Sequence, residues 1–92
     1  MRDDIITLVW PLSGGQEDKT DVFGRIESVG QSEFFAAAQN GLKPQYKVTL
    51  WEHDYNDQPI VIVNDKRYSV YRTYNRTDQK IELYLDGKIG VR

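Results

Sequence analysis

The chain of 92 residues contains no cysteine and one histidine, His53. The absence of cysteine excludes disulfide frameworks, thiolate metal sites and cysteine nucleophiles. A single histidine excludes a histidine-rich zinc site, and in the polar stretch 53–59 it fits a solvated turn residue. No apolar run approaches the roughly 20 residues that cross a bilayer, and the start Met-Arg-Asp-Asp lacks a signal-peptide pattern. We therefore expect a soluble protein without membrane contact.

Patterns typical of catalysis are absent as well. The loop 13–15, Ser-Gly-Gly, is not followed by the Gly-Lys-Ser/Thr of a phosphate-binding loop. The stretch 54–65 begins like a calcium loop but has proline at its sixth position and aspartate at its twelfth. Carboxylate pairs such as Asp3 and Asp4 lie in predicted ends and loops, where nothing would separate their pKa values. We predict no enzymatic activity, no cofactor and no metal.

An excess of positive charge is also missing. The chain has 12 basic and 14 acidic residues, a formal net charge of −2, whereas a general nucleic-acid binder carries a basic excess. Residues 1–42 hold three basic and seven acidic groups (net −4), and residues 43–92 hold nine and seven (net +2). If these halves face different directions, neighbouring copies could attract head to tail in a ring. The alternative is a solvated surface with uneven loops.

Alternating apolar and polar residues predict about six short strands. We expect them near residues 5–10, 22–29, 45–51, 60–63, 67–74 and 81–85. Gly24 allows a bulge or a close approach, and Asn64 and Asp65 tolerate the positive φ of a tight hairpin turn. Closure hides strand edges in short β chains of this spacing. The prediction is a single domain over residues 1–92, mainly β: a small antiparallel β-barrel with one short helix inserted after the second strand.

The stretch 32–44 predicts that helix. Ser32 is a candidate N-cap, Gly41 suits the left-handed C′ position, and Pro44 prevents continuation. A helix of about two turns does not persist alone in water, so its paired aromatic residues are expected to dock it. Because adjacent helical residues point about 100° apart, we expect Phe34 in the core and Phe35 facing elsewhere, or the reverse.

Tyrosines and arginines interleave in and after the predicted strand 67–74, as in platforms that bind single-stranded nucleic acid. The residues are Tyr68, Tyr71, Tyr74, Arg67, Arg72 and Arg76. Strand alternation places Tyr68 and Tyr74 on one face with Arg72, and Tyr71 on the other face. The predicted platform is thereby split, and we favour core tyrosines whose hydroxyls reach solvent.

Short motifs follow one another in order between residues 25 and 90. They are Ser32-Glu33-Phe34-Phe35-x-Ala37, Gly41-Leu42-Lys43-Pro44, Tyr55, Tyr68-Ser69-Val70-Tyr71-Arg72-Thr73 and Ile81-Glu82-Leu83. In this order and spacing the chain resembles the head-closure proteins of long-tailed bacteriophages and related prophages, also called head-completion or head-tail joining proteins. It departs from their pattern at Asn64-Asp65, where a glycine is expected, and the resemblance is loose before Val22.

The resemblance implies a structural protein of the virion neck, assembled in the host cytoplasm as a ring, typically twelve-membered. The ring lies beneath the portal and its adaptor, retains the packaged DNA and gives the tail a docking platform. The implied partners are further copies of the chain, the portal-adaptor protein, a tail completion or tail terminator protein, and the DNA passing through the channel. We expect assembly contacts from Phe35, Leu42, Trp51 and Tyr55. The alternatives are a single-stranded nucleic-acid-binding barrel of the OB or SH3-like type, and a small bacterial adaptor domain unrelated to phage.

Overall fold

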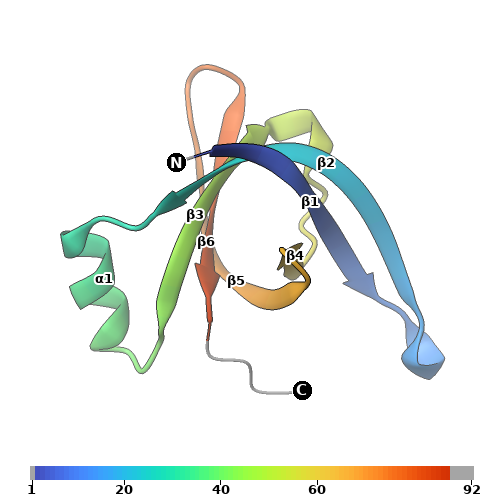
Figure 1. Cartoon of the computed structure of the whole chain (residues 1–92), viewed down its shortest axis with the longest axis horizontal. Coiled ribbons are helices and arrows are strands. Elements are labelled where there is room, and N and C mark those ends of the chain that lie inside the picture. The colour runs from blue at the N-terminus through green and yellow to red at the C-terminus, as the bar shows by residue number, and fades with distance from the viewer. Residues whose placement is uncertain (1, 88–92) are drawn as a thin grey trace.

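A computed structural model describes residues 2–87, which form six strands, one α-helix and two 3₁₀ turns (Figure 1). The strands are β1 (Arg2–Pro11), β2 (Glu17–Ser28), β3 (Pro44–Trp51), β4 (Ile60–Val63), β5 (Lys66–Asn75) and β6 (Lys80–Asp86). The helix α1 covers Gln31–Ala38, and the 3₁₀ turns η1 and η2 cover Ser13–Gly15 and Glu52–Asp54. The predicted class, a mainly β protein with a short helix after the second strand, is confirmed.

The six strands close into an antiparallel barrel in the order β1-β2-β3-β6-β5-β4. The seam between β4 and β1 is short, because only Thr7, Leu8 and Val9 pair with Ile60–Ile62. Closure is favourable even across a short seam, since an open edge strand would leave its N–H and C=O groups without partners. The predicted antiparallel barrel is therefore confirmed, including its closure.

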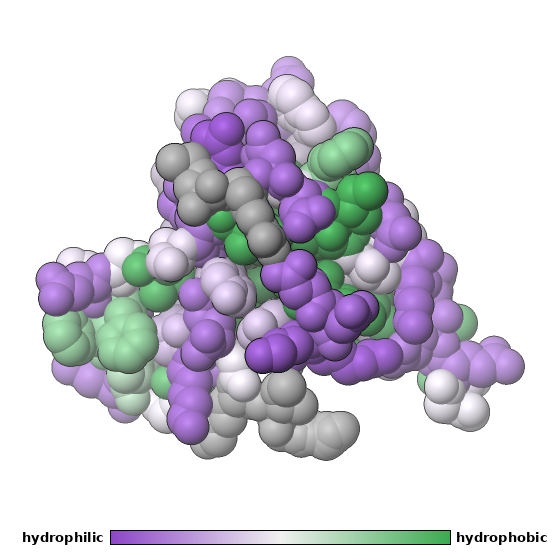
Figure 2. Space-filling model, viewed as in Figure 1, coloured by the Kyte–Doolittle hydropathy of each residue, from purple (hydrophilic) through white to green (hydrophobic). Residues whose placement is uncertain are grey.

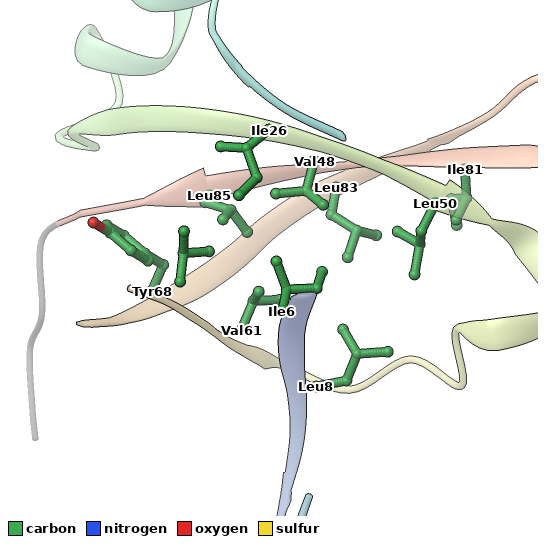
Figure 3. Close-up of a cluster of buried hydrophobic side chains, with 11 residues drawn as sticks. Ile6, Leu8, Ile26, Val48, Leu50, Val61, Tyr68, Ile81, Leu83 and Leu85 are labelled. Carbon is green, nitrogen blue, oxygen red and sulfur yellow. The ribbon is translucent and has the colours of Figure 1, made fainter. Parts of the chain in front are cut away.

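Inward-facing side chains alternate along the strands and fill the barrel (Figure 3). The residues that are 0% exposed in this cluster are Ile6, Leu8, Val48, Val61, Leu83 and Leu85. They come from β1, β3, β4 and β6, so four strands meet in one apolar centre. Complete burial of each such side chain contributes about 1.5–3 kcal/mol relative to exposure. The core is therefore built from the alternation visible in the sequence.

Gly24 of β2 permits the close approach that the sequence predicted. A Cβ atom at this position would lie 2.8 Å from Cγ1 of Val48 and 3.2 Å from Cδ1 of Ile6. The first distance is shorter than a normal carbon–carbon contact, so any side chain here would displace the core. It is the missing side chain of this residue that lets β2 pack closely against β3.

The two hairpins, β4–β5 and β1–β2, differ in how well the sequence predicted them. Asn64 and Asp65 have φ of 52° and 66°, which confirms the predicted tight turn between β4 and β5. The second strand, expected near residues 22–29, begins earlier than expected, because β2 starts at Glu17, opposite Pro11. Main-chain hydrogen bonds extend the β1–β2 ladder beyond the apolar residues, so the polar start of β2 gave no signal of a strand.

The helix differs from its prediction at its N-terminal end only. Its N-cap is Gly30, not Ser32, because the Phe34 N–H donates to the Gly30 carbonyl oxygen over 2.9 Å. At the other end Gly41 has φ of 79°, as predicted. The N–H groups of Gly41 and Leu42 donate to the carbonyl oxygens of Ala38 and Ala37, both over 3.1 Å. This is the Schellman pattern, which satisfies the last carbonyl groups of the helix.

Candidate functional site

The exposed aromatic pair of α1 forms the first candidate surface, here called the helix patch: Phe34 and Phe35. Their side chains are 45% and 58% exposed, and their rings meet edge to face with centroids 6.0 Å apart. Figure 2 shows pale green apolar atoms over α1, on the left of the molecule. The prediction that Phe34 lies in the core is wrong, because Ala37 is the one buried residue of the helix.

A polar cluster, here called the Glu33 clamp, connects the helix to the barrel. The Tyr71 hydroxyl donates to Oε2 of Glu33 over 2.6 Å, and Arg72 donates from Nε and Nη2 over 3.2 and 2.5 Å. The Arg72 guanidinium also lies 4.0 Å from the ring centroid of Tyr84 in β6. A charged bidentate pair with a third hydrogen bond fixes both distance and orientation. The clamp supplies the docking that was expected from the phenylalanines.

A β-bulge in β5 makes the clamp possible. Val70 pairs with Leu85, but the next paired residue is Arg72, opposite Tyr84, so Tyr71 is an extra residue in the strand. The prediction that alternation separates Tyr71 from Arg72 is therefore wrong, since both bind the same carboxylate. A bulge re-aims side chains by interrupting the period of two. No local sequence signal marks this position.

The charges of the clamp support each other at neutral pH. Hydrogen bonds from Arg72 hold the pKa of Glu33 below its ordinary value, and partial burial opposes this shift without reversing it. Burial, together with the bond to Glu33, raises the pKa of Tyr71. Glu33 is thus ionised and Tyr71 is protonated, the two states that their hydrogen bond requires.

The second surface is a groove of about 650 Å³ on the outer face of β2 and β3, reaching the start of β6. Thr49 is central in the groove, because the strand register places it between Arg25 of β2 and Glu82 of β6. Thr49 is 7% exposed, and its Oγ1 has no hydrogen-bond partner within residues 2–87. A buried hydroxyl without a partner is costly, and because this oxygen is buried it lies within the wall of the groove and is not open to a group from outside.

Aromatic side chains border the groove near the C-terminal end of β3. Phe23 is 70% exposed and Trp51 is 46% exposed. The ammonium group of Lys80 lies 5.1 Å from the Trp51 ring centroid, and the His53 ring stacks on Trp51 at 6.2 Å. Exposed aromatic rings next to cations are typical of sites that bind a partner, because the ring offers apolar area at low entropic cost.

Cations outnumber carboxylates among the groove's lining residues. The cations are Arg25, Lys47, Arg76 and Lys80, and the carboxylates are Asp3 and Glu27. Arg25 lies 3.2 Å from Asp3, and Lys47 lies 3.7 Å from Glu27. The lining therefore has a formal net charge of +2 in a chain whose total is −2.

The end of the β1–β2 hairpin, residues 10–18 and here called the hairpin tip, forms the third surface. Figure 1 shows it extending away from the barrel at the lower right. Leu12 is 51% exposed, and the Trp10 indole N–H donates to the Asn56 carbonyl oxygen over 3.0 Å. Glu17 forms two 2.7 Å hydrogen bonds with Arg67 of β5, which hold the pKa of Glu17 below its ordinary value. The hairpin is thus anchored at its base and exposed at its end.

The four predicted contact residues do not form one surface. Phe35 belongs to the helix patch, and Leu42 is half-buried just before β3, whereas Trp51 lies at the other end of that strand, beside the groove. Tyr55 packs against the core and donates its hydroxyl hydrogen to the Gln58 carbonyl oxygen over 2.8 Å. Burial raises the pKa of Tyr55 to about 12. Phe23 and Thr49 were missed, because neither stands out before the strands are placed side by side.

The tyrosines of β5 take three different environments. Tyr68 is 9% exposed and meets Tyr46 edge to face at 5.6 Å, which fits the predicted core role. Tyr71 belongs to the Glu33 clamp, and Tyr74 is 55% exposed, so the prediction of a core tyrosine is wrong at Tyr74. The three rings do not present one continuous stacking surface. The prediction that Tyr68 shares a face with Arg72 is also wrong, since Arg72 lies on the outer face.

Within residues 2–87 no three side chains of the metal-ligating types gather closely enough to hold an ion. The same residues contain no helix with the length and apolarity needed to cross a membrane. Comparisons with protein-family models, with curated proteins and with solved structures found no match.

Proposed function

We propose that the chain is a structural subunit of a bacteriophage head–tail connector. In this proposal it forms a ring beneath the portal and adaptor, closes the DNA-filled head and offers the tail a docking platform. The observation that supports this most is the presence of three separate surfaces with exposed apolar side chains, the helix patch, the groove and the hairpin tip, on one small closed barrel.

Separate surfaces are what a ring subunit needs. A cyclic assembly uses heterologous contacts, in which one surface of a subunit meets a different surface of the next. The helix patch lies on an element that the Glu33 clamp and the buried Ala37 hold to the barrel. We assign this patch to the adaptor or the tail terminator protein, and the surfaces of the rigid barrel to contacts within the ring.

The charge of the chain is compatible with a channel for DNA. A net charge of −2 avoids the dense lysine and arginine lining that would hold phosphates by counterion release. Contacts between exposed charged groups are weak at physiological salt. We therefore expect the isolated protein to be a monomer or small oligomer that completes its ring on the portal-adaptor template.

The test is deletion of the gene in a phage or prophage that encodes the chain, with a plasmid copy as the control. We expect heads that package DNA but lose it, together with free tails of normal length, because an open portal does not resist the pressure of confined DNA. Electron microscopy of the lysate should show empty heads and unattached tails, and the plasmid copy should restore joined particles. Joined virions without the gene, or unexpanded heads that never took up DNA, would contradict the proposal.

The groove also favours a second candidate, a site for single-stranded nucleic acid. Phe23 and Trp51 could stack bases while Arg25 and Lys80 face phosphates. A Trp10→Phe variant leaves Trp51 as the single tryptophan, so its fluorescence can report binding of an oligonucleotide at several salt concentrations. Quenching that weakens steeply with salt would support this candidate, and unchanged fluorescence would reject it.

A further inference from the structure

We propose that the hairpin tip of one subunit inserts into the groove of a neighbouring copy of the same chain. This contact rests on the ring of the proposed function and names the surfaces that build it. The occupant of the groove is a defined segment, residues 10–18, with Leu12 entering beside Phe23 and Trp51.

The two surfaces cannot meet within one chain. The hairpin tip ends at the start of β2, and the groove begins where Phe23 and Arg25 lie on the same strand. From Glu17 to Arg25 the strand spans roughly 26 Å at about 3.3 Å per residue. A paired strand of this barrel does not fold back on itself, so a contact between tip and groove requires a second copy.

The charges of the two surfaces are complementary. Residues 10–18 carry the carboxylates of Glu17 and Asp18, and because Glu17 is paired with Arg67 of its own chain, Asp18 is the charge that the tip presents. Of the four cations that line the groove, Arg25, Lys47 and Arg76 are paired with carboxylates of their own chain, and Lys80 lies against the Trp51 ring as the cation that can meet this charge. Asp18 is exposed, so it can approach this cation when the tip is seated. Complementary charge guides the orientation of a contact even where it adds little affinity.

The groove also offers the tip a defined apolar and polar fit. Leu12 is 51% exposed and would cover apolar area on Phe23, which is 70% exposed. The Lys80 ammonium group, 5.1 Å from the Trp51 ring centroid, is the polar group of the groove that the turn at Ser13–Gly15 can meet. Gly14 and Gly15 have no side chains that would block this approach. A Cβ atom at either position would have no neighbour within 4 Å apart from the residues next to it in the chain. The turn can therefore bring its main chain close to another subunit.

A tip-to-groove contact is heterologous, so it leaves each subunit with one free tip and one free groove. Repetition of the contact extends the assembly until a ring closes. A single contact of this kind can be weak, because the subunit that closes the ring makes two contacts at once. A template that holds the subunits side by side therefore favours the complete ring. The arrangement also leaves the helix patch available for a different partner.

The absence of cysteine gives a clean test with the full chain. The double variant Ser13→Cys with Asp3→Cys places both thiols on exposed positions at the two proposed surfaces and leaves Leu12 and Phe23 in place. Under mild oxidation at high protein concentration we expect a ladder of dimers, trimers and larger species on non-reducing gels. A mixture of the two single variants should give a dimer and stop there, because each single variant keeps one reactive surface.

The control is Ser13→Cys with Gln39→Cys, whose second thiol lies on an exposed position just after α1. Circular dichroism checks that all variants are folded. The proposed pair should cross-link at least about tenfold faster than the control, the ratio that corresponds to a contact favoured by about 1.4 kcal/mol. Equal rates for the two pairs, or a dimer formed as fast by Ser13→Cys alone, would overturn the tip-to-groove contact.

The outcome is separable from that of the proposed function. Empty heads after gene deletion together with equal cross-linking rates would mean that the connector ring uses another contact. A fast ladder together with normal joined virions after deletion would mean that the contact is real and the connector role is wrong. Salt-sensitive oligonucleotide binding lost in a Phe23→Ala variant would assign the groove to nucleic acid instead.

Discussion

The barrel and the helix are parts of one small domain but are stabilised by different interactions. Barrel side chains such as Ile6 and Leu83 are 0% exposed and belong to a core shared by several strands. The helix buries Ala37 and is held by the carboxylate of Glu33, while both of its phenylalanines remain accessible. Apolar burial therefore stabilises the scaffold, and a polar clamp positions the attached element.

The difference teaches that a short helix need not use its largest apolar residues to join the domain. A carboxylate with three hydrogen bonds holds it in place, so Phe34 and Phe35 are left for another molecule. Elements with few buried apolar contacts open at lower free energy than the core. We expect α1 to be the part of the described chain that responds first to changes in charge.

The largest expected effect comes from breaking the barrel core. Leu83→Ala should lower the free energy of unfolding by about 2–5 kcal/mol, because it leaves a cavity among residues that are fully buried. Chemical denaturation measures this value. Leu12→Ala at the exposed hairpin tip is the matched control and should change stability by about 0.5 kcal/mol or less. Similar losses in both variants would contradict the assignment of core and surface.

A smaller effect is expected from removing the charge of the clamp. Glu33→Gln should lower the free energy of unfolding by about 1 kcal/mol, since partly exposed ion pairs contribute little. The more specific effect of Glu33→Gln is expected in α1 alone. Amide hydrogen exchange of α1 should become roughly tenfold faster, while exchange in β3 and β6 stays unchanged. Equal acceleration in strands and helix would show that the clamp stabilises the whole domain.

Acid should reproduce the effect of that variant. Because Arg72 lowers the pKa of Glu33 in the folded protein from the ordinary value of 4.5, the ionised clamp stabilises the fold fully above that value. Its contribution is lost as the pH falls below 4.5 and through the lowered pKa. Exchange in α1, corrected for intrinsic rates, should rise over this window in the wild type and less in Glu33→Gln. A parallel rise in both proteins would assign the acid response to other carboxylates.

The smallest effect on stability is expected at the helix patch. Phe34→Ala and Phe35→Ala should each cost less than about 1 kcal/mol, because neither ring enters the core. If the chain has the proposed connector function, tail joining should fall in a phage carrying either variant although the protein stays folded. Denaturation combined with plaque counts distinguishes the two effects. A loss of about 3 kcal/mol or more for Phe34→Ala would restore the original prediction of a core role.

Local patterns in the sequence were enough to predict the number and approximate positions of the strands and the place of the helix. The period of two along a strand decides which side chains can share a face, so Val48 and Leu50 were predictable partners in the core. The β4–β5 turn was also predictable, because Asn64 and Asp65 tolerate positive φ. These features depend on neighbours a few residues apart, and such neighbours are visible in a sequence.

Only the tertiary structure decided how the helix is held and where the groove lies. The bond from Arg72 to Glu33 joins residues far apart in the chain and depends on the bulge at Tyr71, which reverses the alternation of β5. The groove exists because Thr49 is flanked by two other strands in one particular register. Register and bulges are set by the packing of the whole barrel, since a shift of one residue turns every side chain to the other face. The sequence alone therefore determined the barrel, and its packing determined which surfaces the barrel presents.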